Sequence, residues 1–383
     1  MSNIPNVNNK KNLRVQIIDV SHLFYKFAYG GGPDLSTTLL IDGVPTLVKT
    51  KVPTLVIKAI HRWSKGGIYP TVVCFDSLGS NKCRKAYFKQ GNMTGATGEV
   101  YKGSRTSQSS MFYDDINLTK NLLAQGGVGV LMAEKYEADD LIKAAVDKAK
   151  ATYPDLPIDI ITGDQDFLPL VDDQVSVFLS SPKYTWAAEK SIEKNHYVQI
   201  TPSNYQSYIE ILTEFKNLKM PYNTVLLKKL LSGKKADDIP AYPKFTPTMY
   251  NKLVTQMEED GVDLAGVFRY GAPSSTIINK YTGQEVPADM VSQLPRDLLI
   301  EKFARPAQLD LILETLGKYL DEDKLRHVEF IYNGINLNGA FTDLGVDYRR
   351  RPARITLDIK GYDEITLQKA VDFLKINLPA MDV

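Results

Sequence analysis

Three short apolar runs of this chain each end in aspartate. They are Val15-Gln16-Ile17-Ile18-Asp19, Thr71-Val72-Val73-Cys74-Phe75-Asp76 and Ile158-Asp159-Ile160-Ile161-Thr162-Gly163-Asp164-Gln165-Asp166. A β-branched run closed by a carboxylate is typical of a buried parallel strand, and open α/β sheets bind ligands at the carboxyl edge of such strands. Because carboxylates repel one another, several of them at one edge predict bound cations. Mg²⁺ and Mn²⁺ are the hard ions that prefer oxygen ligands.

A fourth acidic group, Glu137-Ala138-Asp139-Asp140, follows the apolar segment 128–132 and opens a predicted helix. The helix dipole stabilises acids there, and residues three apart share a helix face. Taken alone, this group would be a helix cap, and Asp164 and Asp166 would shape a turn. The joint pattern places all four groups at one edge of one sheet. Many carboxylates without a histidine or cysteine ligand pattern favour Mg²⁺ or Mn²⁺ over zinc.

Basic and aromatic residues alternate after the second run. They are Arg84, Lys85, Tyr87, Phe88, Tyr101, Lys102, Arg105, Phe112 and Tyr113. Two metal ions about 4 Å apart activate a water and stabilise the leaving oxygen of a phosphodiester, and cations nearby would hold the scissile phosphate. The rings could stack on the bases of a single strand, whereas each basic residue by itself could be a solvated helix face. No Gly-x-x-x-x-Gly-Lys-Ser/Thr loop is present, which disfavours an NTPase.

The overall composition is that of a folded protein, with 383 residues, 43% hydrophobic and 24% charged. No apolar stretch approaches the roughly 18 residues of a membrane span, and two cysteines fit a reducing compartment, so we expect a cytoplasmic protein. The net charge is +1. If eight carboxylates form one metal cluster, 46 basic residues face 37 remaining acids, a balance of +9 that suits a polyanionic partner.

Strand-like and helix-like segments alternate over the first 200 residues, which predicts a doubly wound, mainly parallel α/β sheet. Helical patterns dominate afterwards. We therefore predict two domains, residues 1–200 and 201–383, the second mostly helical. Its predicted helices are 203–216, 225–231, 247–259 and 307–319.

From about residue 15 to 245 the chain resembles the flap endonuclease / 5′-3′ exonuclease family, whose nuclease domain is PIN-like. Within that family it is most similar to the T-even phage ribonuclease H branch. The resemblance is carried by Ile18-Asp19, Phe75-Asp76 with Arg84, Tyr101-Lys102-Gly103-Ser104-Arg105, Glu137-Ala138-Asp139-Asp140 and Thr162-Gly163-Asp164-Gln165-Asp166-Phe167.

The resemblance implies a site with two ions. The tighter metal site would be formed by Asp19, Asp76, Glu137, Asp139 and Asp164, and the second by Asp140, Asp166 and Asp237. Lys102 and Arg105 would lie on a helical arch, around residues 84–113, that admits a single-stranded 5′ end and steers the scissile phosphate. Arg84 would add charge just below it. The Gly-, Ser- and Thr-rich segment 90–113 should be mobile without substrate.

Residues 233–240 resemble the family's helix–three-turn–helix motif, expected near 225–256, which grips duplex backbone. Lys234 stands where an acid is common, and residues 241–244 lack the usual closing glycines. A monovalent cation in this motif is therefore left open. Lys85, Lys234, Lys235 and Lys244 are our candidates for direct phosphate contacts.

The leading hypothesis is a metal-dependent, structure-specific 5′-nuclease that acts on DNA with a 5′ flap or 5′ end and on RNA–DNA hybrids, including primers during replication. A PIN-type ribonuclease for single-stranded RNA, a non-catalytic nucleic-acid scaffold and, more weakly, a phosphatase are the alternatives. We expect a monomer, in the host cytoplasm if phage-encoded. A single-strand-binding protein or a sliding clamp is the kind of partner considered for residues 265–383.

Overall fold

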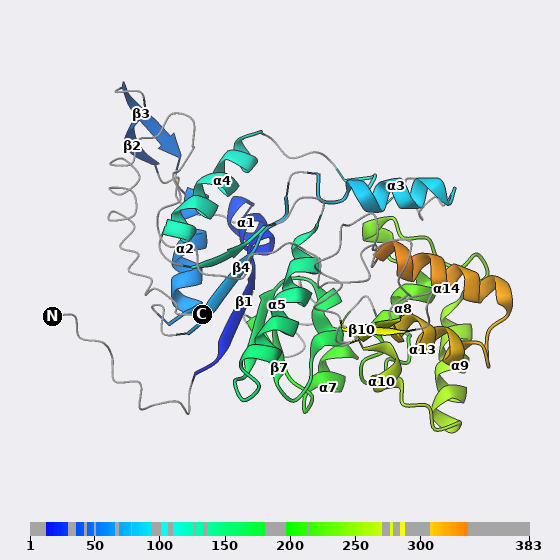
Figure 1. The fold of residues 1–383 in the computed structure, drawn as a ribbon. Coiled ribbons are helices and arrows are strands. Elements are labelled where there is room, and N and C mark those ends of the chain that lie inside the picture. The colour runs from blue at the N-terminus through cyan, green and yellow to red at the C-terminus, as the bar shows by residue number, and fades with distance from the viewer. Residues whose placement is uncertain are drawn as a thin grey trace.

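A six-stranded sheet forms the centre of the molecule in the computed structural model (Figure 1). The structure describes residues 13–29, 36–41, 44–49, 51–65, 69–77, 79–92, 101–105, 110–125, 128–132, 136–180, 197–210, 212, 215–269, 276–278, 284–287 and 307–335. The strands, in the order β5-β4-β1-β6-β7-β8, are β5 (Gly129–Leu131), β4 (Thr71–Cys74), β1 (Val15–Asp19), β6 (Ile158–Thr162), β7 (Val175–Ser180) and β8 (Tyr197–Ile200). All neighbouring strands are parallel except β7 and β8, which confirms the predicted mainly parallel sheet.

Helices cover both faces of this sheet. Successive side chains of a strand point to opposite faces, so Ile17 and Ile18 of β1 enter two different hydrophobic clusters. The cluster around Ile18 contains residues of α1 (Val20–Ala28), α2 (Lys51–Trp63) and α4 (Ser110–Gln125). The cluster around Ile17 contains residues of α5 (Ala138–Thr152). This two-sided packing is why the strands read as continuous apolar runs.

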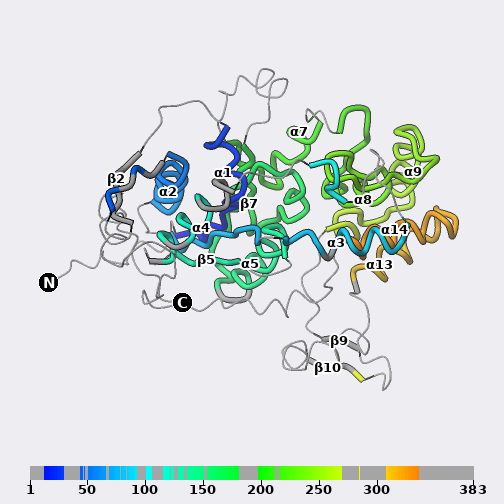
Figure 2. The backbone as a smooth tube through the Cα atoms, turned by 90° about the horizontal axis from the view of Figure 1, so that it is seen from above, coloured from blue at the N-terminus to red at the C-terminus, as the bar shows by residue number. Residues whose placement is uncertain are grey.

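The described residues after 200 are mainly helical, as their periodicity predicts. Its helices are α7 (Tyr205–Ile209), α8 (Val225–Ser232), α9 (Pro247–Glu259), α10 (Leu264–Phe268), α13 (Ala307–Leu316) and α14 (Glu322–Ile335). Thr246 caps α9 by accepting from the amide of Met249, and Pro247 occupies the first turn, where no amide donor is needed. In Figure 2 α8, α9, α13 and α14 gather at the end of the molecule away from α2.

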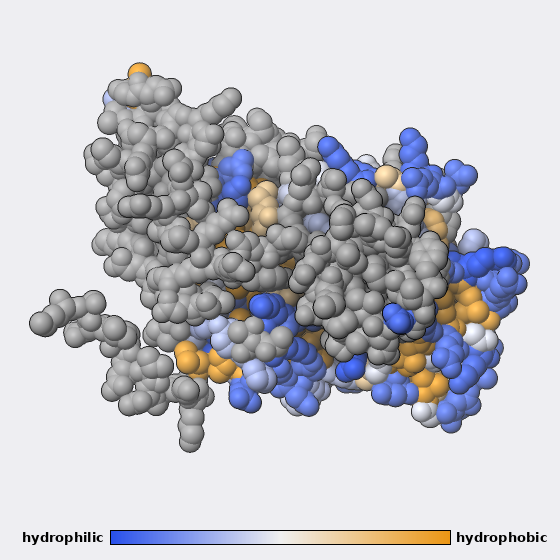
Figure 3. Space-filling view, viewed as in Figure 1, coloured by the Kyte–Doolittle hydropathy of each residue, from blue (hydrophilic) through white to orange (hydrophobic). Residues whose placement is uncertain are grey.

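The helical region shares its core with the sheet. Leu230 of α8 and Ile331 of α14 belong to the same buried cluster as Leu141 of α5. The surface over α9 and α14 alternates between hydrophilic and hydrophobic residues in Figure 3, as expected for amphipathic helices. The division into two domains at residue 200 stays a prediction. Residues from both sides of that position pack in one buried apolar cluster.

Several local expectations need correction. Among the described residues of the helix predicted over 203–216, α7 covers Tyr205–Ile209, and the chain turns at residues 215–218 with Asn217 at φ 67°. Two hairpins were not predicted: β2 (Ser36–Ile41) with β3 (Val44–Lys49), and β9 (Thr276–Ile278) with β10 (Glu285–Pro287). In the arch segment, α3 (Lys82–Gln90) is helical and residues 101–105 form turns, while 93–100 and 106–109 lie outside the described residues. Among the described helices, we find none with the length and apolarity to cross a bilayer.

Candidate active site

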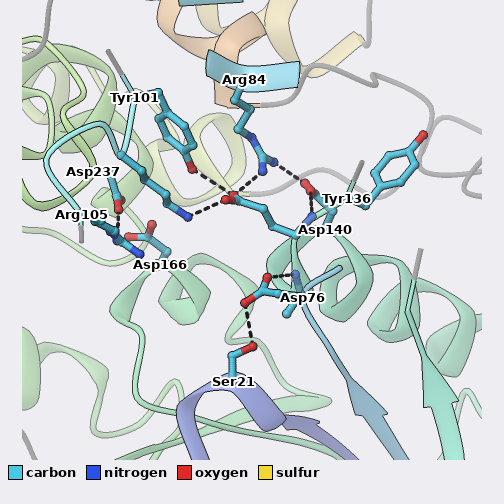
Figure 4. A network of polar contacts seen from close by, with 12 residues as sticks. Ser21, Asp76, Arg84, Tyr101, Arg105, Tyr136, Asp140, Asp166 and Asp237 are labelled. Atoms are coloured by element: carbon cyan, nitrogen blue, oxygen red, sulfur yellow. Dashed lines mark hydrogen bonds and ion pairs between the residues drawn. The ribbon is translucent and has the colours of Figure 1, made fainter. Parts of the chain in front are cut away.

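The carboxyl edge of the sheet gathers the predicted acids, of which Asp76, Asp140, Asp166 and Asp237 are labelled in Figure 4. Asp19 ends β1, Asp76 follows β4, and Asp164 follows β6, and β1 lies between the other two strands. Glu137, Asp139 and Asp140 open α5, which packs against β1, β4 and β6. The short helices η2 (Gln165–Leu170) and η4 (Lys235–Asp237) bring Asp166 and Asp237 to the same edge. All eight predicted acids thus lie in one region.

Asp19 is buried between β1 and α1. Its carboxylate caps α1 by accepting from the amide of His22 over 3.1 Å, and it also accepts from the Thr162 hydroxyl over 2.8 Å. Burial raises the pKa of Asp19 to about 7, although these hydrogen bonds oppose the shift, and Asp76 and Asp164 raise it further. A buried carboxyl surrounded by other acids is an environment that a bound cation would relieve.

Asp76 ties three elements together. One carboxylate oxygen accepts from the amide of Ala138 at the start of α5 over 2.8 Å. The other accepts from the hydroxyl of Ser21 in α1 over 2.7 Å. These bonds fix the distance between the ends of β1 and β4, and therefore the width of the acidic edge.

Asp139 and Asp164 resemble Asp19 in their electrostatics. Desolvation and the neighbouring Asp164 raise the pKa of Asp139 well above its usual range, and desolvation and Asp166 raise the pKa of Asp164. We call Asp19, Asp139 and Asp164 the inner acids. Their oxygen donors and mutual repulsion fit a hard divalent ion. Within the described part of the chain, no group of three His, Cys, Asp or Glu side chains is already arranged to hold a metal ion.

Glu137 is held by cations rather than exposed to other acids. Arg84 forms an ion pair with it, Lys102 donates to it over 2.7 Å, and the Tyr101 hydroxyl donates to it over 3.0 Å. Burial alone would raise the pKa of Glu137, but Lys102 and Arg84 outweigh burial and lower it to about 2. Glu137 and Asp140 also form the predicted helix cap, in which the Glu137 amide donates to Asp140 over 3.0 Å.

Arg84 shares Glu137 with Lys102, and its donors are already engaged. Its guanidinium bonds Asp140 over 2.5 Å and the carbonyl of Ile335 over 2.8 and 3.1 Å, in addition to Glu137. This arrangement links α3, α5 and α14. The predicted role of Arg84 as a charge beneath the phosphate stays a prediction, and its observed contacts are structural.

Asp166 and Asp237 are paired with a second set of cations. Lys229 lies 2.6 Å from Asp166, Lys234 lies 2.9 Å from Asp166 and 3.2 Å from Asp237, and Arg105 lies 2.5 Å from Asp237. Burial would raise the pKa of Asp166, but Lys229 and Lys234 outweigh it and hold that pKa well below its usual range. We define Asp166 and Asp237 as the outer acids.

Two of these cations differ from the sequence prediction. Lys234, predicted to face DNA, points into the acids. Lys229 was not predicted at all. Its only signal was a pair of lysines, Lys228-Lys229, inside the otherwise apolar α8. Lys235 and Lys244 are exposed, Lys85 is partly exposed on α3, and within the described residues none of these three forms an ion pair with the acids.

The segment 101–105 closes over the site from the side of α3. The Lys102 amide donates to the carbonyl of Asp237 over 2.8 Å, and Ser104 donates to Asp238 from its hydroxyl over 2.7 Å. A cavity of about 50 Å³, lined by Glu137, Asp139, Asp166 and Lys229 among others, lies beneath it. Solvent reaches the inner acids at Asp164, whose side chain is 38% exposed.

Comparison with known proteins gives the family context for this geometry. The chain is 25% identical over 206 residues to DNA polymerase I of Caldicellulosiruptor bescii, and 29% identical over 183 residues to the thermostable DNA polymerase I of Thermus filiformis. These matches cover 54% and 48% of this chain but only 21% and 19% of the polymerases, so the chain spans about a fifth of the relatives' length.

Two solved structures align over most of the chain. The alignment with the bacteriophage T5 5′-exonuclease with bound zinc covers 95% of this chain and 99% of the T5 chain. The two sequences are 12% identical over it, and the TM-score is 0.43. The alignment with the catalytic core of Rad2 in complex with DNA substrate covers 88% of this chain and 82% of the Rad2 chain, with 13% identity and a TM-score of 0.38. A family model, the 5′-3′ exonuclease N-terminal, resolvase-like domain, matches residues 14–199. These residues, which carry seven of the eight predicted acids, belong to the 5′-3′ exonuclease N-terminal domain family.

Proposed function

We propose that this chain is a divalent-metal-dependent 5′-nuclease that hydrolyses phosphodiester bonds near 5′ flaps or 5′ ends. The observation that carries the proposal is the juxtaposition, at one sheet edge, of two inner acids without an ion-pair partner among the described residues, Asp19 and Asp139, with the cations Lys102 and Arg105. Carboxylates alone would repel a nucleic acid, and cations alone would only bind it. Side by side, they support a site that holds a metal and a phosphate together.

The inner acids would hold Mg²⁺ or Mn²⁺. Such an ion lowers the pKa of a water and stabilises developing negative charge on phosphate oxygens. Asp19 is kept in place by its bonds to His22 and Thr162, so it would present its oxygens with little loss of side-chain entropy. Lys102, only 13% exposed and already oriented by Glu137, would orient the scissile phosphate. Arg105, 53% exposed, would meet the strand first.

DNA with a 5′ flap or a free 5′ end is the proposed substrate class, with RNA–DNA hybrids, as in primer removal, as the second. The exposed Lys235 and Lys244 lie beyond the outer acids and would contact duplex phosphates. We further propose that the protein acts as a monomer in the cytoplasm, of a host cell if the chain is phage-encoded. A single-strand-binding protein or a sliding clamp remains the proposed kind of partner for residues 265–383.

End-labelled substrates test the proposal. We expect cleavage near the junction of a 5′ flap and of an RNA–DNA hybrid with Mg²⁺ or Mn²⁺, and none with chelator. Cleavage confined to single-stranded RNA would support the PIN-type ribonuclease instead. Binding of every substrate without cleavage of any would support the non-catalytic scaffold.

A further inference from the structure

The acids at the sheet edge differ in what balances their charge. Among the described residues, Asp19 and Asp139 form no ion pair with a lysine or arginine, whereas Asp166 and Asp237 contact Lys229, Lys234 and Arg105 directly. Asp19 and Asp139 therefore need a cation from solution. The outer acids already have cations that belong to the chain.

Lys234 occupies the centre of the outer group. Its ammonium lies 2.9 Å from Asp166, 3.2 Å from Asp237 and 3.5 Å from Asp164, and its side chain is only 13% exposed. An ammonium has three N–H donors, so it can serve three carboxylates at once. This is the position that a cation bridging the inner and outer acids would take.

The backbone holds Lys234 in this position. Its amide and carbonyl both bond Ile239 over 3.1 Å, and its carbonyl also accepts from the amide of Asp237. Gly233, at φ 64°, sets the direction in which the chain leaves α8. The lysine is thus fixed by a small closed turn, not by a flexible loop.

The charges also balance at this end of the site. Asp164, Asp166 and Asp237 carry three negative charges, and Lys229, Lys234 and Arg105 carry three positive charges. A divalent ion placed here would add two positive charges within a few ångströms of the Lys234 ammonium, and like charges at such short range repel strongly in a buried site.

We propose that Lys234, supported by Lys229, supplies the positive charge at the outer acids, so that the chain holds one tightly bound divalent ion, at the inner acids, in place of two. This inference rests on the proposed nuclease function and deepens it. In the reaction, the Lys234 ammonium would take over part of the stabilisation of the leaving oxygen.

Counting bound Mn²⁺ by electron paramagnetic resonance tests the inference without any activity measurement. We expect one tight Mn²⁺ per wild-type chain. Two tight ions would overturn the inference while leaving the proposed function intact. No tight ion would overturn both, because the inner acids would then not be a metal site.

Two variants sharpen the test. Lys234→Asp should bind a second Mn²⁺ at least tenfold more tightly than the wild type does. Lys235→Asp changes the charge equally at an exposed neighbour and should leave the count at one. An equal gain in both variants would mean that general charge, not the position of Lys234, sets the count. If Lys234→Asp does not fold, the wild-type count alone decides.

A separate observation points to a second binding site, at the opposite edge of the sheet. A cavity of about 630 Å³ lies where β1 and β6 begin and α2 ends, lined by Arg14, Gln16, Arg62, Trp63, Tyr69 and Asp159 among others. Its volume is within the range of small-molecule sites. No described acid of the candidate active site lines it.

Two side chains that line this cavity each keep one buried oxygen without a partner among the described residues. Gln16 and Asp159 are each 1% exposed and are bonded to each other over 2.7 Å through the amide nitrogen and Oδ2, and Oδ2 also accepts from Arg14 over 2.9 Å. The remaining oxygens, Gln16 Oε1 and Asp159 Oδ1, are buried and accept nothing from the described residues. Buried acceptors without donors are unfavourable, so a ligand that brings N–H groups would be stabilised here once these two side chains turn towards the cavity.

The other residues that line the cavity indicate the chemical class of the ligand. Arg62 and Lys65 are exposed at the end of α2, which disfavours a cation and favours an anionic group. Trp63 and Tyr69 offer ring surface. We infer that the cavity binds a guanine nucleotide, whose base presents two adjacent N–H donors to Gln16 and Asp159 and whose phosphate faces Arg62 and Lys65.

Quenching of Trp63 fluorescence by GMP, with chelator present, tests this site. We expect saturable quenching that is lost in Trp63→Phe, and about tenfold weaker binding of IMP, which lacks the amino group. Gln16→Leu should weaken the binding of GMP by a similar factor. A strand with a 5′-terminal guanosine that binds tighter than GMP identifies a strand end as the source, and weaker binding identifies the free nucleotide. No saturable quenching, or equal binding of GMP and IMP, overturns the inference.

Discussion

The Lys102 ammonium donates to the Glu137 carboxylate over 2.7 Å, although the two residues come from a turn and a helix start 35 positions apart. Arg84 contacts the same carboxylate, so one buried acid orients two cations. The pair places a positive charge directly beside the inner acids. It is therefore the point at which the site for a metal and the site for a phosphate meet.

Replacing Lys102 should slow chemistry more than it weakens binding. Loss of a pre-oriented charge facing a developing oxyanion typically lowers a rate by about 10²–10³. We therefore expect Lys102→Ala to reduce single-turnover cleavage of a 5′ flap by that factor, with substrate affinity changed by less than tenfold. Lys89→Ala, on the exposed face of α3, is the matched control. Equal losses in rate and affinity would assign Lys102 to binding alone.

Asp139→Asn should abolish turnover and raise the free energy of unfolding. The variant removes one repelled, desolvated carboxylate, so the metal-free protein should gain about 1 kcal/mol or more in its free energy of unfolding. Turnover should be abolished while flap binding in chelator is retained. Chemical denaturation and cleavage assays measure the two effects.

The exposed Asp155→Asn is the control for Asp139→Asn, and it should change neither quantity. Persistent cleavage by Asp139→Asn would remove Asp139 from the metal site. A loss of stability in chelator would instead show that the carboxylate is favourably placed without a metal.

Stability should fall on acidification through His327. Burial lowers the pKa of His327 to about 4 from an ordinary value near 6.5, and its Nε2 has no hydrogen-bond partner among the described residues. Between these values the unfolded chain binds the proton more readily, so the contribution is complete above about pH 6.5 and is lost as pH falls towards 4. We expect a loss of up to about 2 kcal/mol at pH 5.

Urea denaturation of the wild type and of His327→Gln at pH 7.5 and pH 5 isolates this contribution. The other titrating groups contribute equally to the pH dependence of both proteins. The difference in the free energy of unfolding between the wild type and His327→Gln therefore reports on His327 alone. An identical pH dependence would mean that folding does not shift the pKa of His327.

Gly233→Ala should be far more destabilising than Gly261→Ala, although both glycines have positive φ, 64° and 72°. A Cβ at Gly233 would lie 2.3 Å from the carbonyl oxygen of Ile239, which is backbone and cannot rotate away. A Cβ at Gly261 meets nothing within 4 Å. Gly261→Ala should therefore cost about 1 kcal/mol from φ strain alone, and Gly233→Ala several times more.

Thermal denaturation of both glycine variants checks this comparison. Similar losses would show that the turn holding Lys234 can relax. A large loss in Gly233→Ala together with weakened cleavage would link this turn to the position of Lys234 beside the outer acids.

The sequence by itself determined the central strands β1, β4 and β6, the acids at their ends and the helix start at Glu137. These features are local. A β-branched apolar run predicts a buried strand, and the aspartate that closes it marks where the strand stops, so Asp19, Asp76 and Asp164 could be assigned to one edge. The short strand and helix patterns also sufficed for the parallel sheet.

Only the tertiary structure decided which charges meet. Lys234 was predicted to face DNA, and Lys229 was given no role within the predicted helix 225–231, yet both point into the acids. Their direction depends on how α8 and the turn at Gly233 pack against η2, some 63 to 70 positions away along the chain. No local pattern encodes such a meeting. It follows from burial, because a lysine that cannot reach water lies against the nearest carboxylates.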